Sequence, residues 1–183
     1  MELNKKWFGK IVAECLRRYL TLGLLLVTVV NFQSCSYSFT GSSIPPHLKT
    51  ISIPVFNDKS GSGEFDLNRK LTIQLIQKFI DDNTLLISDR QNSDSILDGT
   101  IVGLSDAPNV VSGGEKVSSR RITITVRAVY KDLVKKQQIF EKNFSNYGDY
   151  VVGGDITSAR KLAIESAIDK ITEDILLGVV SNW

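Results

Sequence analysis

The sequence is short of the residues that most catalytic and metal sites require. Its 183 residues include one histidine, two cysteines and one methionine. A Cys/His metal site needs several ligands at a defined spacing, and a Ser-His-Asp or Cys-His arrangement would have to use the single histidine, His47. His47 follows two prolines, so we expect it in an exposed loop, and neither a G-x-S-x-G motif nor a D-x-D-x-D-G loop is present. The sequence therefore predicts no enzyme, no metal and no cofactor.

The chain also lacks an excess of charge once its first 34 residues are set aside. The whole sequence has 22 basic and 20 acidic residues, a formal net charge of +2. Residues 1–34 hold five of the basic and two of the acidic residues, which leaves a body with a net charge of −1. Nucleic-acid affinity comes mainly from many Lys and Arg contacts to phosphates. A nearly neutral body therefore argues against nucleic acid as a partner.

The apolar run near the N-terminus is too short to be a convincing membrane span. It extends from Tyr19 to Val30, which is about 18 Å of helix against a hydrocarbon core of about 30 Å. The basic residues Arg17 and Arg18 precede it, and small and polar residues follow it. This three-part build is typical of a secretory signal peptide. We expect residues 1–34 to be a cleaved export signal.

The two cysteines do not predict a disulfide. Cys15 lies inside the signal, so the exported chain keeps only Cys35, and a lone thiol in an oxidising compartment is a hazard unless it is used. The segment Val29–Cys35 (VVNFQSC) resembles a bacterial lipobox, in which a small residue, here Ser34, precedes a cysteine that receives a diacylglyceryl group. The alternative is an ordinary signal with an incidental cysteine. Acyl chains on Cys35 would anchor the protein stably to a membrane.

Periodicity predicts a single α+β domain over residues 49–183, joined to Cys35 by a tether over residues 35–48 that is rich in Ser, Gly and Pro. The segment Ala107–Lys116 contains two glycines and is expected to be a long loop. The order of elements predicts two helices packed on one face of a mostly antiparallel sheet of about four strands. The predicted strands are Lys49–Phe56, Leu85–Ser88, Ser95–Ser105, Ser118–Leu133 and Gln137–Tyr147. The predicted helices are Phe65–Ile80 and a long helix from Ile156 onward with Asp155 or Ser158 near its start.

The predicted strand Ser118–Leu133 has the most informative surface pattern. Arg121 and Arg127 fall on one face, six residues or about 20 Å apart, and Lys131 follows them. Arginine forks suit phosphate and carboxylate groups, so this face is a candidate contact for an anionic partner such as a lipid A headgroup. The alternative is a solvated sheet face whose charges only keep it soluble. The opposite, buried face is predicted to consist of Ile122, Ile124, Val126, Ala128 and Tyr130.

The segment CSYSFTGSSIPPHLKTISIPVF, which begins at Cys35, resembles the LptE family of lipopolysaccharide-assembly lipoproteins. Cys35, Tyr37, Phe39 and Gly41 take the places of the family's Cys-Gly-aromatic pattern and of the glycine that follows it. Ser36 stands where a glycine is usual. The predicted helix, β-meander and closing helix extend the resemblance over most of the exported chain.

This resemblance implies a lipid-anchored protein on the periplasmic face of the outer membrane. Its implied function is to plug the LptD β-barrel and to help that barrel assemble and deliver lipopolysaccharide to the cell surface. The implied partners are an LptD-type barrel, lipopolysaccharide, and the membrane through the N-terminal lipid anchor. On this view Arg121, Arg127 and Lys131 are candidates for lipopolysaccharide contact, and Val111 and Ser112, in the expected long loop, are candidates for barrel contact.

A second resemblance gives the main alternative. The segment Lys49–Gly63 (KTISIPVFNDKSGSG) is similar to the strand and loop that open periplasmic lipoproteins of the curli-secretion and penicillin-binding-protein-activator type. Those domains alternate strands and helices further along the chain, whereas a meander is predicted here. We therefore favour the LptE-type function.

Overall fold

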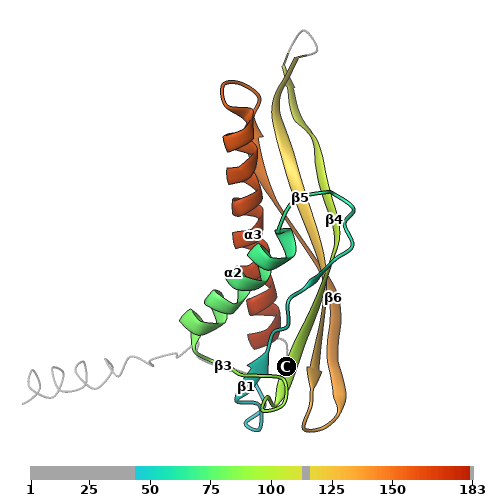
Figure 1. Ribbon diagram of the computed structural model, residues 1–183, viewed down its shortest axis with the longest axis vertical. Coiled ribbons are helices and arrows are strands. Elements are labelled where there is room, and N and C mark those ends of the chain that lie inside the picture. Colours follow the sequence, from blue (N-terminus) through green and yellow to red (C-terminus); the bar gives the residue numbers. More distant parts are fainter. Residues whose placement is uncertain (1–43, 113–115, 182–183) are drawn as a thin grey trace, which may run out of the picture. The chain divides into compact units, whose positions relative to one another are not determined.

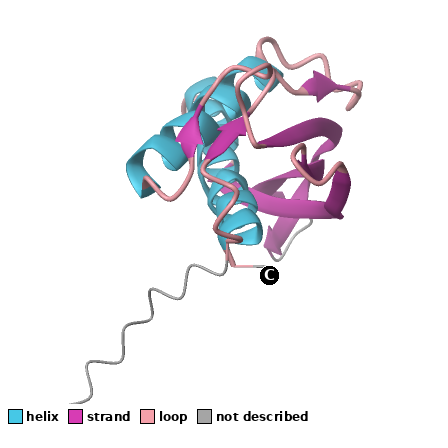
Figure 2. Ribbon diagram, turned by 90° about the horizontal axis from the view of Figure 1, so that it is seen from below, coloured by secondary structure: helices cyan, strands magenta, loops and turns pink. Residues whose placement is uncertain are grey.

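Six strands and two helices make up the part of the chain that the structure describes, residues 44–112 and 116–181 of a computed structural model (Figure 1). Both helices lie on the same side of the sheet (Figure 2), which confirms the α+β class. The strands are β1 (Thr50–Ser52), β2 (Asn57–Asp58), β3 (Leu86–Ile87), β4 (Ser95–Ser112), β5 (Lys116–Asp132) and β6 (Gln137–Val151), and the helices are α2 (Leu67–Asp82) and α3 (Ile156–Val180).

The sheet is mixed and has six strands, so the expectation of about four mostly antiparallel strands is wrong in number and in direction. Its order is β3-β1-β4-β5-β6, and β2 also pairs with β4. The strands β4, β5 and β6 are antiparallel, whereas the three short strands pair in parallel. The expected strand Lys49–Phe56 is interrupted because Pro54 has no backbone N–H to donate. Only β1 lies within this segment, and β2 follows it; the two strands pair separately with β4.

The expected loop Ala107–Lys116 is also wrong, because most of it is strand. The pairing of β4 with β5 continues to Ser112 opposite Lys116. Register shifts lie between Pro108 and Val110 and between Val110 and Val111. Irregularities of this kind accommodate a residue that cannot take part in the regular ladder, such as proline. Pairing with β5 thus continues through a segment whose composition predicted a loop.

The core lies between the helices and the inner face of β5, as the alternating pattern predicted. Its five predicted residues are fully buried: Ile122, Ile124, Val126, Ala128 and Tyr130. The Tyr130 hydroxyl donates to Ser95 Oγ at 3.2 Å, and burial raises the pKa of Tyr130 to about 12. Of the two residues expected near the start of α3, Asp155 is the N-cap, and its side chain accepts from the Ser158 N–H.

His47 is not the exposed loop residue that the sequence suggested. Its Nε2 lies 2.7 Å from Asp132 Oδ2, and the Asp132 side chain is only 1% exposed. The neighbouring Leu48 is buried in the core and donates its N–H to the Pro45 carbonyl. This turn, which local sequence does not reveal, brings residues 45–48 against the end of β5.

Candidate functional site

The exposed face of the sheet, opposite the helices, carries the three residues proposed for lipopolysaccharide contact. Arg121, Arg127 and Lys131 lie on β5 and alternate with its buried apolar residues. Between the two arginines, Thr125 Oγ1 lies 3.1 Å from Ser145 Oγ on β6. We call this surface, made by Arg121, Thr125, Arg127 and Lys131 with their cross-strand neighbours, the polar face.

Arg121 is already engaged by groups on β6. Its Nε and one terminal nitrogen donate to the two Asp149 carboxylate oxygens at 2.7 and 2.8 Å. The guanidinium carbon also lies 3.6 Å from the centroid of the Tyr147 ring. The hydrogen bonds from Arg121 hold the pKa of Asp149 below its usual value, and they raise the pKa of Arg121 itself. The fork of Arg121 is therefore occupied by a carboxylate of its own chain.

Arg127 and Lys131 make looser ion pairs. Arg127 is 3.7 Å from Glu141, and its side chain is 48% exposed. Lys131 Nζ donates to Asp98 Oδ2 at 3.3 Å. Of the three candidate cations, Arg127 is thus the one whose donors an incoming phosphate could reach with the least displacement.

The acidic partners of these cations were missed by the sequence analysis. Asp149 lies directly opposite Arg121 in the pairing of β5 with β6. The register beside the turn at residues 133–136, where Lys131 faces Gln138, would be one residue away from the pairing of Arg121 with Asp149 if it continued without interruption. A register shift between Tyr130 and Lys131 moves by one residue every β5–β6 pair that lies farther from the turn. No sequence signal locates that shift.

The structure does not bring the other candidate residues to the polar face. Val111 and Ser112 belong to the last residues of β4, where the backbone pairs with Val117 and Lys116 at the far end of the β4–β5 hairpin. Their side chains lie outside the described part of the structure. Cys35 lies outside the described residues, as does the whole segment 1–34, so lipidation remains a prediction.

A second polar cluster lies on the helix-facing side of the sheet. Asp106 accepts hydrogen bonds from Arg120 Nε at 2.7 Å, from the Tyr150 hydroxyl at 2.9 Å and from Arg160 Nε at 3.4 Å. Arg160 also donates to Glu64 at 2.7 Å. Burial raises the pKa of Asp106, but the hydrogen bonds from Arg120, Tyr150 and Arg160 outweigh it and hold that pKa below its usual value. Two arginines balance two carboxylates, so the cluster joins β4, β5, β6 and α3 without a net charge.

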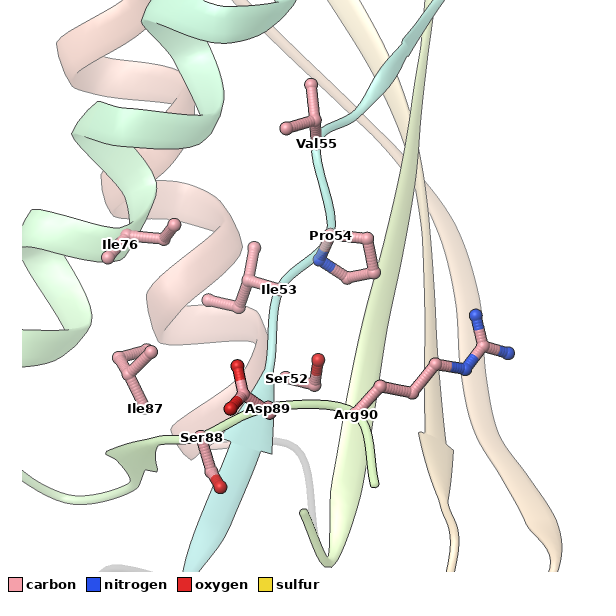
Figure 3. A pocket seen from close by; sticks show the side chains of 9 residues that line it. All are labelled: Ser52, Ile53, Pro54, Val55, Ile76, Ile87, Ser88, Asp89 and Arg90. Carbon is pink, nitrogen blue, oxygen red and sulfur yellow. The ribbon is translucent and has the colours of Figure 1, made fainter. Parts of the chain in front are cut away.

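An open groove of about 750 Å³ lies beside β1 (Figure 3). Its apolar floor comes from residues 53–55, from Ile76 on α2 and from Ile87 on β3. Asp89 and Arg90 are its only titratable groups, and Figure 3 shows Arg90 extending away from the apolar side chains. Among the described residues, neither serine of the groove, Ser52 or Ser88, is hydrogen-bonded to Asp89.

Within residues 44–112 and 116–181, no group of three or more His, Cys, Asp or Glu side chains could hold a metal ion. None of the described helices is both long and apolar enough to cross a membrane.

The fold and the polar face together define a small two-layer α+β domain with a charge-paired sheet surface. The model of the LptE family, described as lipopolysaccharide-assembly, matches residues 48–177. The chain therefore belongs to the LptE family. A comparison with curated proteins found no match.

Solved structures from other bacteria share the fold. A hypothetical protein from Chlamydia trachomatis is 7% identical, with a TM-score of 0.59 over 74% of this chain and 97% of the other. The rare lipoprotein B from Shewanella oneidensis is 13% identical, with a TM-score of 0.52 over 73% and 95%. The lipoprotein B from Nitrosomonas europaea is 12% identical, with a TM-score of 0.51 over 73% and 83%. At these identities the likeness concerns the fold alone.

Proposed function

We propose that the chain is the lipid-anchored plug of an LptD-type β-barrel in the outer membrane. In this function it helps the barrel to assemble and to deliver lipopolysaccharide to the cell surface. The observation that carries the proposal is the match of the LptE family model to residues 48–177. That match covers most of the domain from the end of the tether to the last turns of α3.

The polar face supports a place inside a barrel. Barrel lumens are polar, and a charge that is buried there without a partner is costly. Each of the three cations on this face forms an ion pair with a carboxylate of the same chain. The pairs are Arg121–Asp149, Arg127–Glu141 and Lys131–Asp98. A surface of this kind can be enclosed by a polar wall without leaving an isolated charge.

The anchor and the location follow from the N-terminal sequence. Residues 1–34 act as the export signal, residues 35–48 as the tether, and residues 49–183 as the domain. Acylation of Cys35 then holds the protein on the periplasmic face of the outer membrane.

The primary test is an affinity purification of the tagged full-length protein from detergent-solubilised outer membranes of its own host. Mass spectrometry of the bait and of the co-eluting proteins should find acylated Cys35 and one large β-barrel near equal stoichiometry. Recovery of a penicillin-binding protein or of a secretion-channel ring would instead support the alternative class of lipoprotein. An unmodified Cys35 would contradict the anchor.

Contact with the barrel wall can be tested at the far end of the β4–β5 hairpin. A photocrosslinking amino acid at Val111 or Ser112 should give a crosslink to the barrel in intact cells. The matched control carries the same group at Val55, an exposed residue beside β1. The absence of a crosslink to the barrel from both hairpin positions would contradict contact through this end of the domain.

Lipopolysaccharide contact is assigned to Arg127, with Arg121 and Lys131 contributing less because their ion pairs are shorter. Binding of labelled lipopolysaccharide to the full-length protein should weaken about fivefold in Arg127→Ala, which corresponds to about 1 kcal/mol. Arg121→Ala should have a smaller effect. Lys161→Ala, an exposed lysine on α3, is the control. Unchanged affinity in the double variant R121A/R127A would exclude this contact.

A further inference from the structure

Two aspartates hold three loops together at one end of the domain. Asp94 Oδ2 accepts from the N–H groups of Lys49 and Thr50 at 2.9 and 3.0 Å, and the Asp94 carbonyl accepts from the Leu133 N–H at 2.8 Å. The backbone hydrogen bond from Lys49 is the main cause that lowers the pKa of Asp94. Asp132 accepts from the Lys135 N–H at 2.8 Å and pairs with His47. We call this region, residues 44–50, 88–94 and 132–137, the clasped end.

The clasped end exposes more positive than negative charge. Lys49, Arg90, Lys135 and Lys136 are exposed, and none of them has an ion-pair partner among the described residues. The carboxylates of Asp94 and Asp132 already accept the hydrogen bonds just described. Asp98 is paired with Lys131. Asp89 is the one exposed carboxylate of the described loops at this end.

An apolar side chain lies at the tip of the same end. Val134 is 57% exposed in the turn between β5 and β6 and directly precedes Lys135 and Lys136. An apolar residue flanked by lysines is suited to the interface between lipid headgroups and acyl chains, where the apolar group enters and the ammonium groups meet phosphates.

The chain also enters the domain at this end, since Ile44–Leu48 leads directly into β1 (Figure 1). Eight residues separate Cys35 from Ile44 in the sequence, so nine residue steps join the two. A fully extended chain of nine residues spans at most about 32 Å. A lipid on Cys35 therefore keeps the clasped end near the bilayer surface, whereas the β4–β5 hairpin and the β6–α3 turn lie at the opposite end of the sheet (Figure 1).

We propose that the clasped end docks on anionic phospholipid headgroups of the leaflet that holds the anchor, with Val134 entering the interface and Lys135 and Lys136 binding phosphates. This inference rests on the lipid anchor of the proposed function. It adds a defined orientation, in which the long axis of the sheet stands away from the membrane surface.

The test measures how deeply the β5–β6 turn enters a bilayer. The full-length acylated protein is reconstituted into vesicles of phosphatidylethanolamine and phosphatidylglycerol that contain a doxyl-lipid quencher. A bimane fluorophore is attached in the variant V134C, and the matched control is V152C, another exposed valine in a turn at the opposite end of the sheet. We expect quenching about threefold stronger at position 134 than at position 152, and its loss in pure phosphatidylcholine vesicles.

Reversing the charge of Lys135 and Lys136 tests whether quenching at position 134 depends on headgroup binding or only on the closeness of the tethered domain to the bilayer. K135E/K136E should abolish the difference between the two probe positions. The control K70E/K161E changes the charge equally on exposed lysines of the helix layer and should leave the difference intact. Equal quenching at positions 134 and 152, or quenching that is insensitive to K135E/K136E, would overturn the docking. Quenching that requires added lipopolysaccharide would assign the surface to that glycolipid and would also overturn it.

The mass of the N-terminal peptide from the same sample distinguishes a failure of the docking from a failure of the anchor. Acylated Cys35 without quenching at position 134 would overturn the docking and leave the plug function standing. Unacylated Cys35 would overturn the anchor, and with it both the proposed location and the docking.

Discussion

At the scale of single residues, Gly148 is required by the close approach of β6 to α3. A Cβ added at this position would lie 2.0 Å from the carbonyl oxygen of Ala163. That atom belongs to the backbone of α3, so no side-chain rotation can relieve the contact. The absence of a side chain on Gly148 thus lets the helix lie directly on the edge strand.

We expect Gly148→Ala to destabilise the domain by about 3 kcal/mol or more, because either β6 or α3 must shift. The measurement is the free energy of unfolding in urea. Gly153→Ala is the matched control, since an added Cβ there meets nothing within 4 Å. Equal stability of the two variants would show that α3 is not held this close to β6.

At the scale of elements, the Asp106 cluster joins the sheet to the helix layer. Its members come from β4, β5, β6 and α3, and Glu64 adds the segment that precedes α2. Arg160 is central because it donates both to Asp106 and to Glu64. Its side chain is 33% exposed, so its hydrogen bonds are partly shielded from water.

Arg160→Met should lower the free energy of unfolding by about 1–3 kcal/mol, because it leaves two partly buried carboxylates with fewer donors. Arg69→Met is a matched control: Arg69 is 65% exposed and pairs only locally with Asp66. The control should change stability by less than about 0.5 kcal/mol. Thermal or urea unfolding of the two variants decides the matter, and equal losses would contradict a joining role for Arg160.

At the scale of the whole molecule, several carboxylates hold their protons less tightly in the folded state than in the unfolded chain. The pKa values of Asp94, Asp106, Asp132, Asp149 and Asp155 are all lowered. Burial opposes the shift at Asp106 and Asp132, but the hydrogen bonds that they accept outweigh it. The unfolded chain therefore binds more protons near the ordinary carboxyl pKa of 3.8.

The stability from these carboxylates should be fully present above the ordinary carboxyl pKa and should be lost as the pH falls through the lower folded-state values. Urea midpoints should accordingly change little from pH 7 to pH 5 and fall clearly by pH 3. Asp132→Asn should be less stable than the parent at pH 7 and should lose less on acidification. A parent protein that gains stability toward pH 3 would contradict the lowered pKa values of these carboxylates in the folded state.

Much of this architecture could be predicted from local sequence patterns. The alternation from Ile122 to Tyr130 predicts the inner face of β5, because side chains in a strand point to opposite faces in turn. The helices follow from apolar spacing, and Asp155 marks the start of α3. The family resemblance rests on the segment after Cys35 together with this order of elements.

What could not be predicted depends on contacts between distant segments. The interruption at Pro54 is readable as a strand end, but the separate parallel pairing of β1 and β2 with β4 is not. Register shifts in β4 and beside Tyr130 decide which carboxylate faces which arginine. The pair of His47 with Asp132 joins residues 85 positions apart. No local pattern encodes such a separation.

The parallel pairing of β1 has a consequence for the order in which the protein folds. β4, β5 and β6 are joined through consecutive hairpins, and such contacts between neighbouring segments form early. β1 must instead wait for β3 and β4, and its bond from Thr50 to Asp94 spans 44 residues. Although β1 is the first of the described strands in the sequence, it is therefore among the last to pair. Throughout this interval its apolar residues Ile51 and Ile53 remain open to aggregation or to a chaperone.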